Sequence, residues 1–157
     1  LVKENLTVVY DDPANLTGRA HMMSAAMMGA TAFQKGLGAI HALSHPIGAI
    51  YHTHHGTTNA VVMQAVMRFN RSEIEDRFVS AARYLDIEGG FDGFYDFVGG
   101  LVTHLNIPKN LTDLGLRDLG NADFDRIVAA ALNDPSAGGN PRALTAKNTR
   151  ALLEACF

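Results

Sequence analysis

Apolar residues recur at helical spacing along almost the whole of this 157-residue chain, and no two alternating apolar runs are joined by a hairpin turn. The pattern predicts an all-α protein of roughly seven to nine helices without internal repeats. A chain of this length can bury a real hydrophobic core within one domain. We therefore expect a single helical domain that spans residues 1–157.

Caps and helix breakers predict where the helices lie. Asn15 begins a helix that reaches about residue 35, and a second helix runs from about residue 37 to Tyr51, with Pro46 able to kink it. A turn at 52–56 separates this helix from the next. Further helices are expected at 57–68, from a capping box at 72–75 onward, at 91–105, at 123–133 and at 145–156, with a short helix or turn at 111–119.

The first 35 residues contain an uncapped apparent helix end and a methionine-rich helix. Residues 1–6 are typical of the last turns of a helix, with no cap and no initial methionine, which indicates a fragment of a longer protein. The helix that follows contains Met22, Met23, Met27 and Met28 among alanine and glycine. Such a helix is expected to be buried on several sides, with the methionines filling gaps in the core.

Charge and cysteine content exclude several classes of function. The net charge of −3 gives no electrostatic reason to expect nucleic acid or a membrane surface as a partner. The single cysteine, Cys156, allows no internal disulfide, and no apolar run is long enough to cross a bilayer. These features favour a cytoplasmic protein.

The most unusual stretch is histidine-rich. Five of the seven histidines lie between His41 and His55, among apolar, small and hydroxyl side chains. Histidine is the commonest metal ligand, and His41 and His45 would share one face of a helix, so chain geometry alone favours this pair. His52 and His54 are interpreted as polar turn residues, and the other two histidines as structural or surface residues. No zinc-peptidase, nucleophile-elbow or dinucleotide-binding motif is present.

The same stretch resembles a known family. Residues 32–49, the His-Gly-x-x-Asn-Ala motif at 55–60, residues 66–70 and the Gly-Asn-Pro-Arg segment at 139–142 are similar to the iron-containing (group III) alcohol dehydrogenases. That family includes lactaldehyde reductase, butanol dehydrogenase and glycerol dehydrogenases. The resemblance implies the helical carboxyl-terminal domain of a dehydroquinate-synthase-like fold, without the amino-terminal α/β domain that binds NAD or NADP.

The resemblance also implies roles for four residues. His41 and His55 match metal ligands of the family, and Phe33 matches an aromatic residue of the substrate pocket. His45 matches a histidine beside the nicotinamide that is assigned to positioning or proton relay and not to the metal. The family's other two ligands form an Asp-x-x-x-His motif, which this chain lacks. The family pattern therefore pairs His41 with His55, in place of the pair favoured by spacing.

We expect the carboxyl-terminal half of an alcohol dehydrogenase that uses Fe²⁺, or alternatively Zn²⁺, with NAD or NADP. Its substrate would be a small alcohol and the matching aldehyde or ketone, and its partners the missing domain and a second copy in a homodimer. The chain alone would be inactive, because half of the ligands are missing. The alternatives are a maleylacetate reductase or zinc glycerol dehydrogenase, a non-catalytic helical histidine-rich metal-binding module, or a purely structural helical domain.

Overall fold

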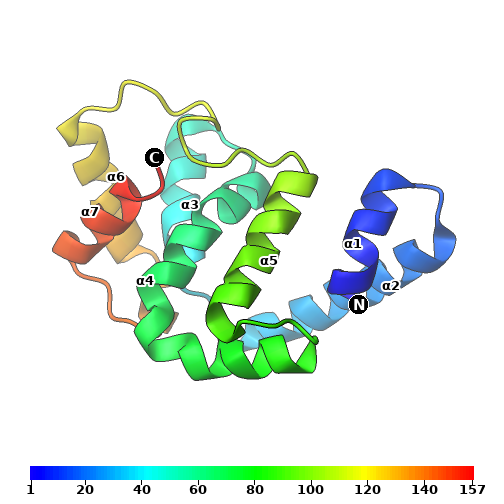
Figure 1. Cartoon of the computed structure of the whole chain (residues 1–157). Coiled ribbons are helices and arrows are strands. Elements are labelled where there is room, and N and C mark those ends of the chain that lie inside the picture. The colour runs from blue at the N-terminus through cyan, green and yellow to red at the C-terminus, as the bar shows by residue number, and fades with distance from the viewer.

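A computed structural model describes all residues, 1–157, and contains α-helices and two short 3-10 helices but no strand (Figure 1). The predicted all-α class is confirmed, with seven α-helices. None of the seven α-helices combines the length with the apolar composition that a membrane span needs. The elements are α1 (Val2–Asp11), α2 (Leu16–Ala32), η1 (Phe33–Lys35), α3 (Ala39–Tyr51), α4 (His55–Tyr84), α5 (Gly90–His104), α6 (Asn121–Asn133), η2 (Ala137–Gly139) and α7 (Ala146–Glu154).

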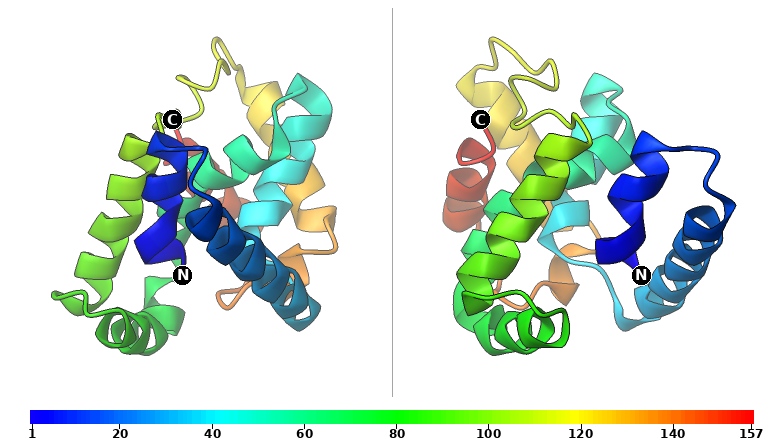
Figure 2. Two further views of the ribbon diagram at one scale, coloured as in Figure 1. Left: turned by 90° about the vertical axis from the view of Figure 1, so that its right-hand side faces the viewer. Right: turned by 45° about the vertical axis from the view of Figure 1, so that its right-hand side comes forward.

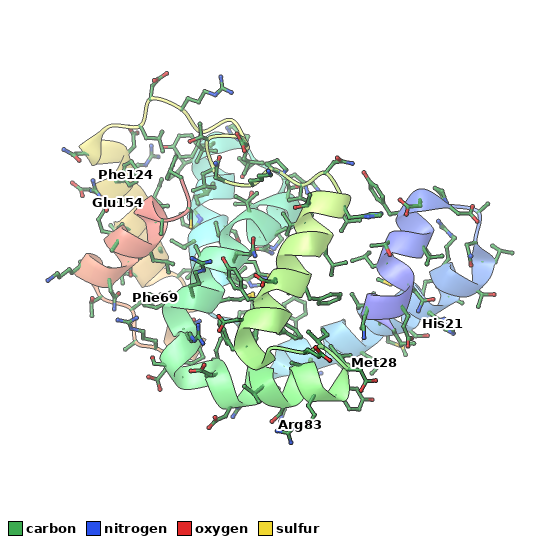
Figure 3. All side chains as sticks on the ribbon, viewed as in Figure 1. His21, Met28, Phe69, Arg83, Phe124 and Glu154 are labelled. Atoms are coloured by element: carbon green, nitrogen blue, oxygen red, sulfur yellow. The ribbon has the colours of Figure 1, made fainter.

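The helices form a main body and a protruding pair. Helix α4 packs against α3 and α5, while α6 packs against α3 and α7. Helices α1 and α2 pack against each other and lie to one side of this body, as the views in Figures 1 and 2 agree. Figure 3 labels His21 on α2, and its ring Nδ1 is 3.1 Å from Oδ1 of Asn5 on α1.

The main core surrounds α3. Leu43 and Ile47 of this helix are completely buried, together with Val62 of α4, Ile127 of α6 and Leu153 of α7. The core also encloses Pro46, and α3 continues through this residue to Tyr51. Because α3 is held on several sides, the histidines that it carries stand on a fixed support.

Several predicted helix ends were wrong. The two helices expected at 57–68 and from 72 onward are one 30-residue helix, α4, in which Ser72 donates to Glu73 and caps nothing. Its cap is His54, two residues beyond the left-handed residue His52. The short helix or turn expected at 111–119 is a turn over residues 111–115, and the predicted caps at Asn15 and Thr145 are confirmed by their side-chain hydrogen bonds.

The expectation of a buried methionine helix was also wrong. Met23, Met27 and Met28 of α2 are 75%, 67% and 62% exposed, and Gly18 is the only buried residue of this helix. Helix α2 touches α1 and η1 but is not covered by the body. Composition indicated an apolar helix correctly, but it could not show whether another element covers that helix.

Candidate metal centre

The start of α3 is fixed by two buried asparagines. The Ala39 backbone N–H donates to Oδ1 of Asn140 at 3.1 Å, and Asn140 and Asn70 exchange side-chain hydrogen bonds of 2.9 and 2.7 Å. Asn70 belongs to α4 and Asn140 follows η2. Hydrogen bonds therefore connect the first turn of α3 to α4 and to the segment after η2. These contacts fix the position of the backbone that carries His41.

The start of α4 turns His55 back toward α3. His52 adopts a left-handed backbone conformation with φ of 57°, which ends α3 and reverses the chain. The ring Nδ1 of His54 then accepts a hydrogen bond from the Thr57 backbone N–H at 3.3 Å, so that α4 begins at His55. Histidines separated by fourteen positions in the sequence thus meet across one tight connection.

Three histidine rings form a triangle between α3 and α4. The ring centroids of His41 and His45 are 5.6 Å apart, those of His41 and His55 5.4 Å, and those of His45 and His55 5.3 Å. The rings of His45 and His55 are nearly parallel, at 17°. The structure therefore brings together the pair favoured by helical spacing and the pair implied by the family resemblance.

The amide of Asn59 lies between two of these rings. Its Nδ2 atom is 3.3 Å from Nε2 of His41 and 3.1 Å from Nε2 of His55. Its Oδ1 atom is buried and has no hydrogen-bond partner. The Nε2 atoms of His41 and His55 therefore face a common point, whereas His45 is engaged elsewhere.

His45 is paired with an acidic residue that sequence analysis did not identify. Its Nδ1 atom is 2.8 Å from Oδ2 of Asp134, at the carboxyl-terminal end of α6. Burial by itself raises the pKa of Asp134, but hydrogen bonds from Ser136 and His45 outweigh it and hold the pKa below its ordinary value. Asp134 is thus an anion that orients the His45 ring and leaves its Nε2 free.

His41 is electrostatically distinct from a free imidazole. Burial lowers its pKa first, and the nearby rings of His45 and His55 lower it further, against an opposing effect of Asp134. His41 is therefore neutral at pH 7, as a histidine must be in order to ligate a metal.

Phe33 lies at the edge of the triangle. Its ring meets that of His41 edge-to-face at 5.8 Å, and it is 52% exposed on η1. Beside His41 is a cavity of about 270 Å³, which is lined chiefly by residues 36–41, Asn70 and residues 139–141. An apolar ring and a small cavity therefore adjoin the histidine triangle.

The donor set fits a divalent ion in part. Two imidazole Nε2 atoms converge, and imidazole suits both iron and zinc. However, no group of three or more His, Cys, Asp or Glu residues could hold a metal ion. The remaining histidines of the cluster, His52 and His54, lie in the connection before α4, where His54 serves as its cap. The chain thus offers two converging imidazole nitrogens, whereas a metal site normally contains three or four protein ligands.

Comparison with known proteins extends over the whole chain. Residues 1–157 match the Fe-containing alcohol dehydrogenase family, C-terminal. The chain is 38% identical over 152 residues to 4-hydroxybutyrate dehydrogenase of Cupriavidus necator, covering 91% of this chain and 39% of that protein. It is 34% identical over 117 residues to lactaldehyde reductase of Escherichia coli strain K12, covering 70% of this chain and 30% of that protein.

The fold is similar to that of a solved structure as well. The crystal structure of a 1,3-propanediol oxidoreductase superimposes with a TM-score of 0.91 at 28% identity, covering 99% of this chain and 42% of the other. This chain therefore spans about two fifths or less of the length of the relatives that it matches.

Proposed function

Since this chain belongs to the Fe-containing alcohol dehydrogenase family, as its carboxyl-terminal helical domain, we propose that it is the metal-holding part of an NAD- or NADP-dependent alcohol dehydrogenase. The enzyme would interconvert a small alcohol and its aldehyde or ketone. The observation that carries this proposal is the convergence of the Nε2 atoms of His41 and His55 on one point. The nicotinamide would be bound mainly outside these 157 residues.

The contacts of each residue of the site support a role for it. His41 and His55 would hold Fe²⁺, or alternatively Zn²⁺, through Nε2. When bound, the ion polarises the oxygen of the alcohol or carbonyl. His45, held at Nδ1 by Asp134, has its Nε2 available to accept or deliver a proton. Phe33 supplies an apolar wall, which favours the carbon chain of the substrate over water.

The two-ligand set also determines what this chain can do alone. Two imidazoles and solvent hold a divalent ion more weakly than three or four protein ligands do. We therefore propose that the isolated chain binds metal weakly and does not catalyse turnover by itself.

Anaerobic titration with Fe²⁺ and Zn²⁺ tests this function. His41→Ala and His55→Ala are each expected to weaken binding by roughly tenfold or more, whereas His45→Ala leaves it nearly unchanged, because His45 pairs with Asp134. Tight one-to-one binding that is lost in His45→Ala, His52→Ala or His54→Ala would instead identify a free-standing histidine-rich metal module. Absence of any specific uptake would indicate a purely structural domain.

A further inference from the structure

We propose that Asn59 is a positioning residue that holds His41 and His55 in the tautomer whose Nε2 lone pairs face one another, ready for a metal ion. The inference rests on the proposed metal-binding role of these two histidines. It assigns a task to a residue that is itself neither a ligand nor a proton donor to substrate.

The position of Asn59 makes such a task feasible. It lies one helical turn after His55 on α4, while His41 lies on α3, so its amide bridges the two helices. An amide nitrogen carries two hydrogens and has no lone pair to donate. With Nδ2 at 3.3 Å from one Nε2 and 3.1 Å from the other, one hydrogen can be given to each ring.

An imidazole that accepts at Nε2 carries its proton on Nδ1. Both rings are then neutral, and their free lone pairs point at the same amide nitrogen. That nitrogen therefore marks the place where the two donors converge. Such a contact fixes ring orientation and tautomer before any ion arrives, and the amide must withdraw from both Nε2 atoms when an ion takes their lone pairs.

The opposite orientation of the amide is less favourable. It would place Oδ1 between the two rings. The amino group would then occupy the buried position of the present Oδ1, where no hydrogen-bond partner is available. A buried carbonyl oxygen without a partner occurs more often in proteins than a buried N–H without one. In the observed orientation both hydrogens of the amide have a partner, one on each histidine ring.

The first test measures tautomers in the metal-free full chain. Long-range ¹H–¹⁵N correlation spectra at pH 8, where imidazoles are neutral, report which ring nitrogen carries the proton. We expect the Nδ1–H form for both His41 and His55. The Nε2–H form at either ring would overturn the inference, and this measurement needs no variant.

The second test compares variants of the amide. Asn59→Leu preserves size but donates nothing, so both metal-free rings should become mixtures of the two tautomers. Asn59→Asp can only accept, so both metal-free rings should change to the Nε2–H form. Unchanged tautomers of His41 and His55 in Asn59→Leu would overturn the inference.

Asn5→Leu is the matched control. Asn5 also contacts a histidine, with its Oδ1 atom 3.1 Å from Nδ1 of His21, but this pair lies on the α1–α2 hairpin. Only the His21 signal should change in this variant. Nδ1–H tautomers in a chain that takes up no metal would refute the proposed function alone, whereas Nε2–H tautomers in a chain with normal uptake would refute the role of Asn59 alone.

Discussion

His41 combines the chemical properties that a metal ligand needs. Its position on α3 buries part of the ring and places His45 and His55 within 5.6 Å of it, centroid to centroid. Burial first, and these two rings second, lower its pKa from the ordinary value of 6.5. Protonation of His41 is therefore disfavoured in the folded chain, and its lone pair stays available to lower pH than that of a free imidazole.

The resulting pH dependence has a definite sign. Below pH 6.5 the unfolded chain binds a proton at His41 more readily than the folded chain does, so acid both destabilises the fold and competes with metal. We expect metal uptake to be lost as pH falls below about 6. Zn²⁺ titrations between pH 5 and 8, with circular dichroism to confirm the helices, test this. Equal affinity over the range would contradict it.

At the residue scale the sequence could identify histidines but not their partners. His41, His45, Phe33 and His55 were found by clustering and by a family motif, and the structure places them together. Asp134, by contrast, lies 89 positions beyond His45, next to a proline, and has no motif around it. Only the packing of α6 on α3 brings the two together, and that packing is a property of the fold as a whole.

At the scale of elements, the segment around η2 packs closely against the loop before α3. A Cβ atom on Gly139 would lie 2.0 Å from the backbone oxygen of Leu37, so only glycine allows the two segments to approach this closely. The neighbouring Gly138 has open space around the same position. This close approach explains why glycine precedes Asn140 in the Gly-Asn-Pro-Arg segment.

The two glycines form a matched pair for a stability measurement. Gly139→Ala is expected to lower the free energy of unfolding by about 1–3 kcal/mol, because the Leu37 segment must move. Gly138→Ala should remain within about 0.5 kcal/mol of wild type. Urea denaturation followed by circular dichroism compares them. Equal midpoints for the two variants would show that this contact does not constrain the fold.

The presence of the helices was predicted more accurately than the residues at which they begin and end. The caps at Asn15 and Thr145 use oxygen-bearing side chains that ordinarily cap helices, so local chemistry was sufficient. The division of α4 at Ser72 failed, because a serine with an acidic neighbour resembles a cap even inside a helix. Packing against both α3 and α5 keeps α4 continuous there, and tertiary packing is not visible in a local pattern.

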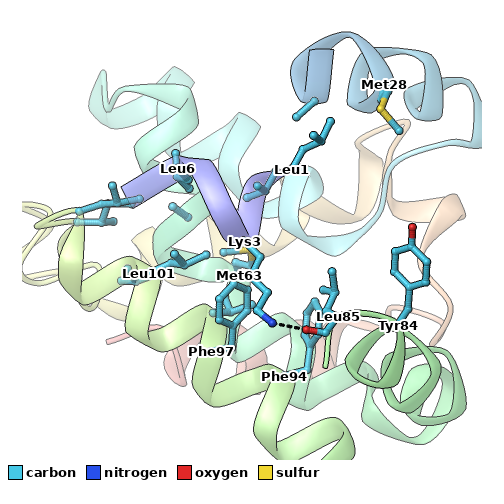
Figure 4. Close-up of a pocket in the computed structure, with 17 residues that line it drawn as sticks. Leu1, Lys3, Leu6, Met28, Met63, Tyr84, Leu85, Phe94, Phe97 and Leu101 are labelled. Carbon is cyan, nitrogen blue, oxygen red and sulfur yellow. Dashed lines mark hydrogen bonds between the residues drawn. The ribbon is translucent and has the colours of Figure 1, made fainter. Parts of the chain in front are cut away.

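At the scale of the whole molecule, the α1–α2 pair leaves apolar surface uncovered. Between this pair and helices α4 and α5 is a cavity of about 660 Å³, in which Lys3 is the only lining residue that is not hydrophobic (Figure 4). Its Nζ atom donates to the backbone oxygen of Leu85 at one rim (Figure 4). The exposed Met23 and Met27 extend the apolar character along α2. Exposed patches of this kind favour association.

We expect a second copy of the chain to cover part of this surface. Sedimentation velocity should show association that increases with concentration, and Met27→Lys should weaken it because a charge enters the contact. Ser72→Lys adds the same charge to an exposed position of α4 and should leave association unchanged. A monomer at all concentrations would contradict this expectation.

X-ray absorption spectroscopy at the zinc edge on the Zn²⁺-loaded chain tests the pairing of His41 with His55 most directly. We expect two imidazole nitrogens at about 2.0–2.1 Å from the zinc, with oxygen atoms completing the shell. One imidazole should remain in His41→Ala and one in His55→Ala. Three or more imidazoles in the wild-type chain, or two in either variant, would show that the metal is held by another part of the histidine cluster.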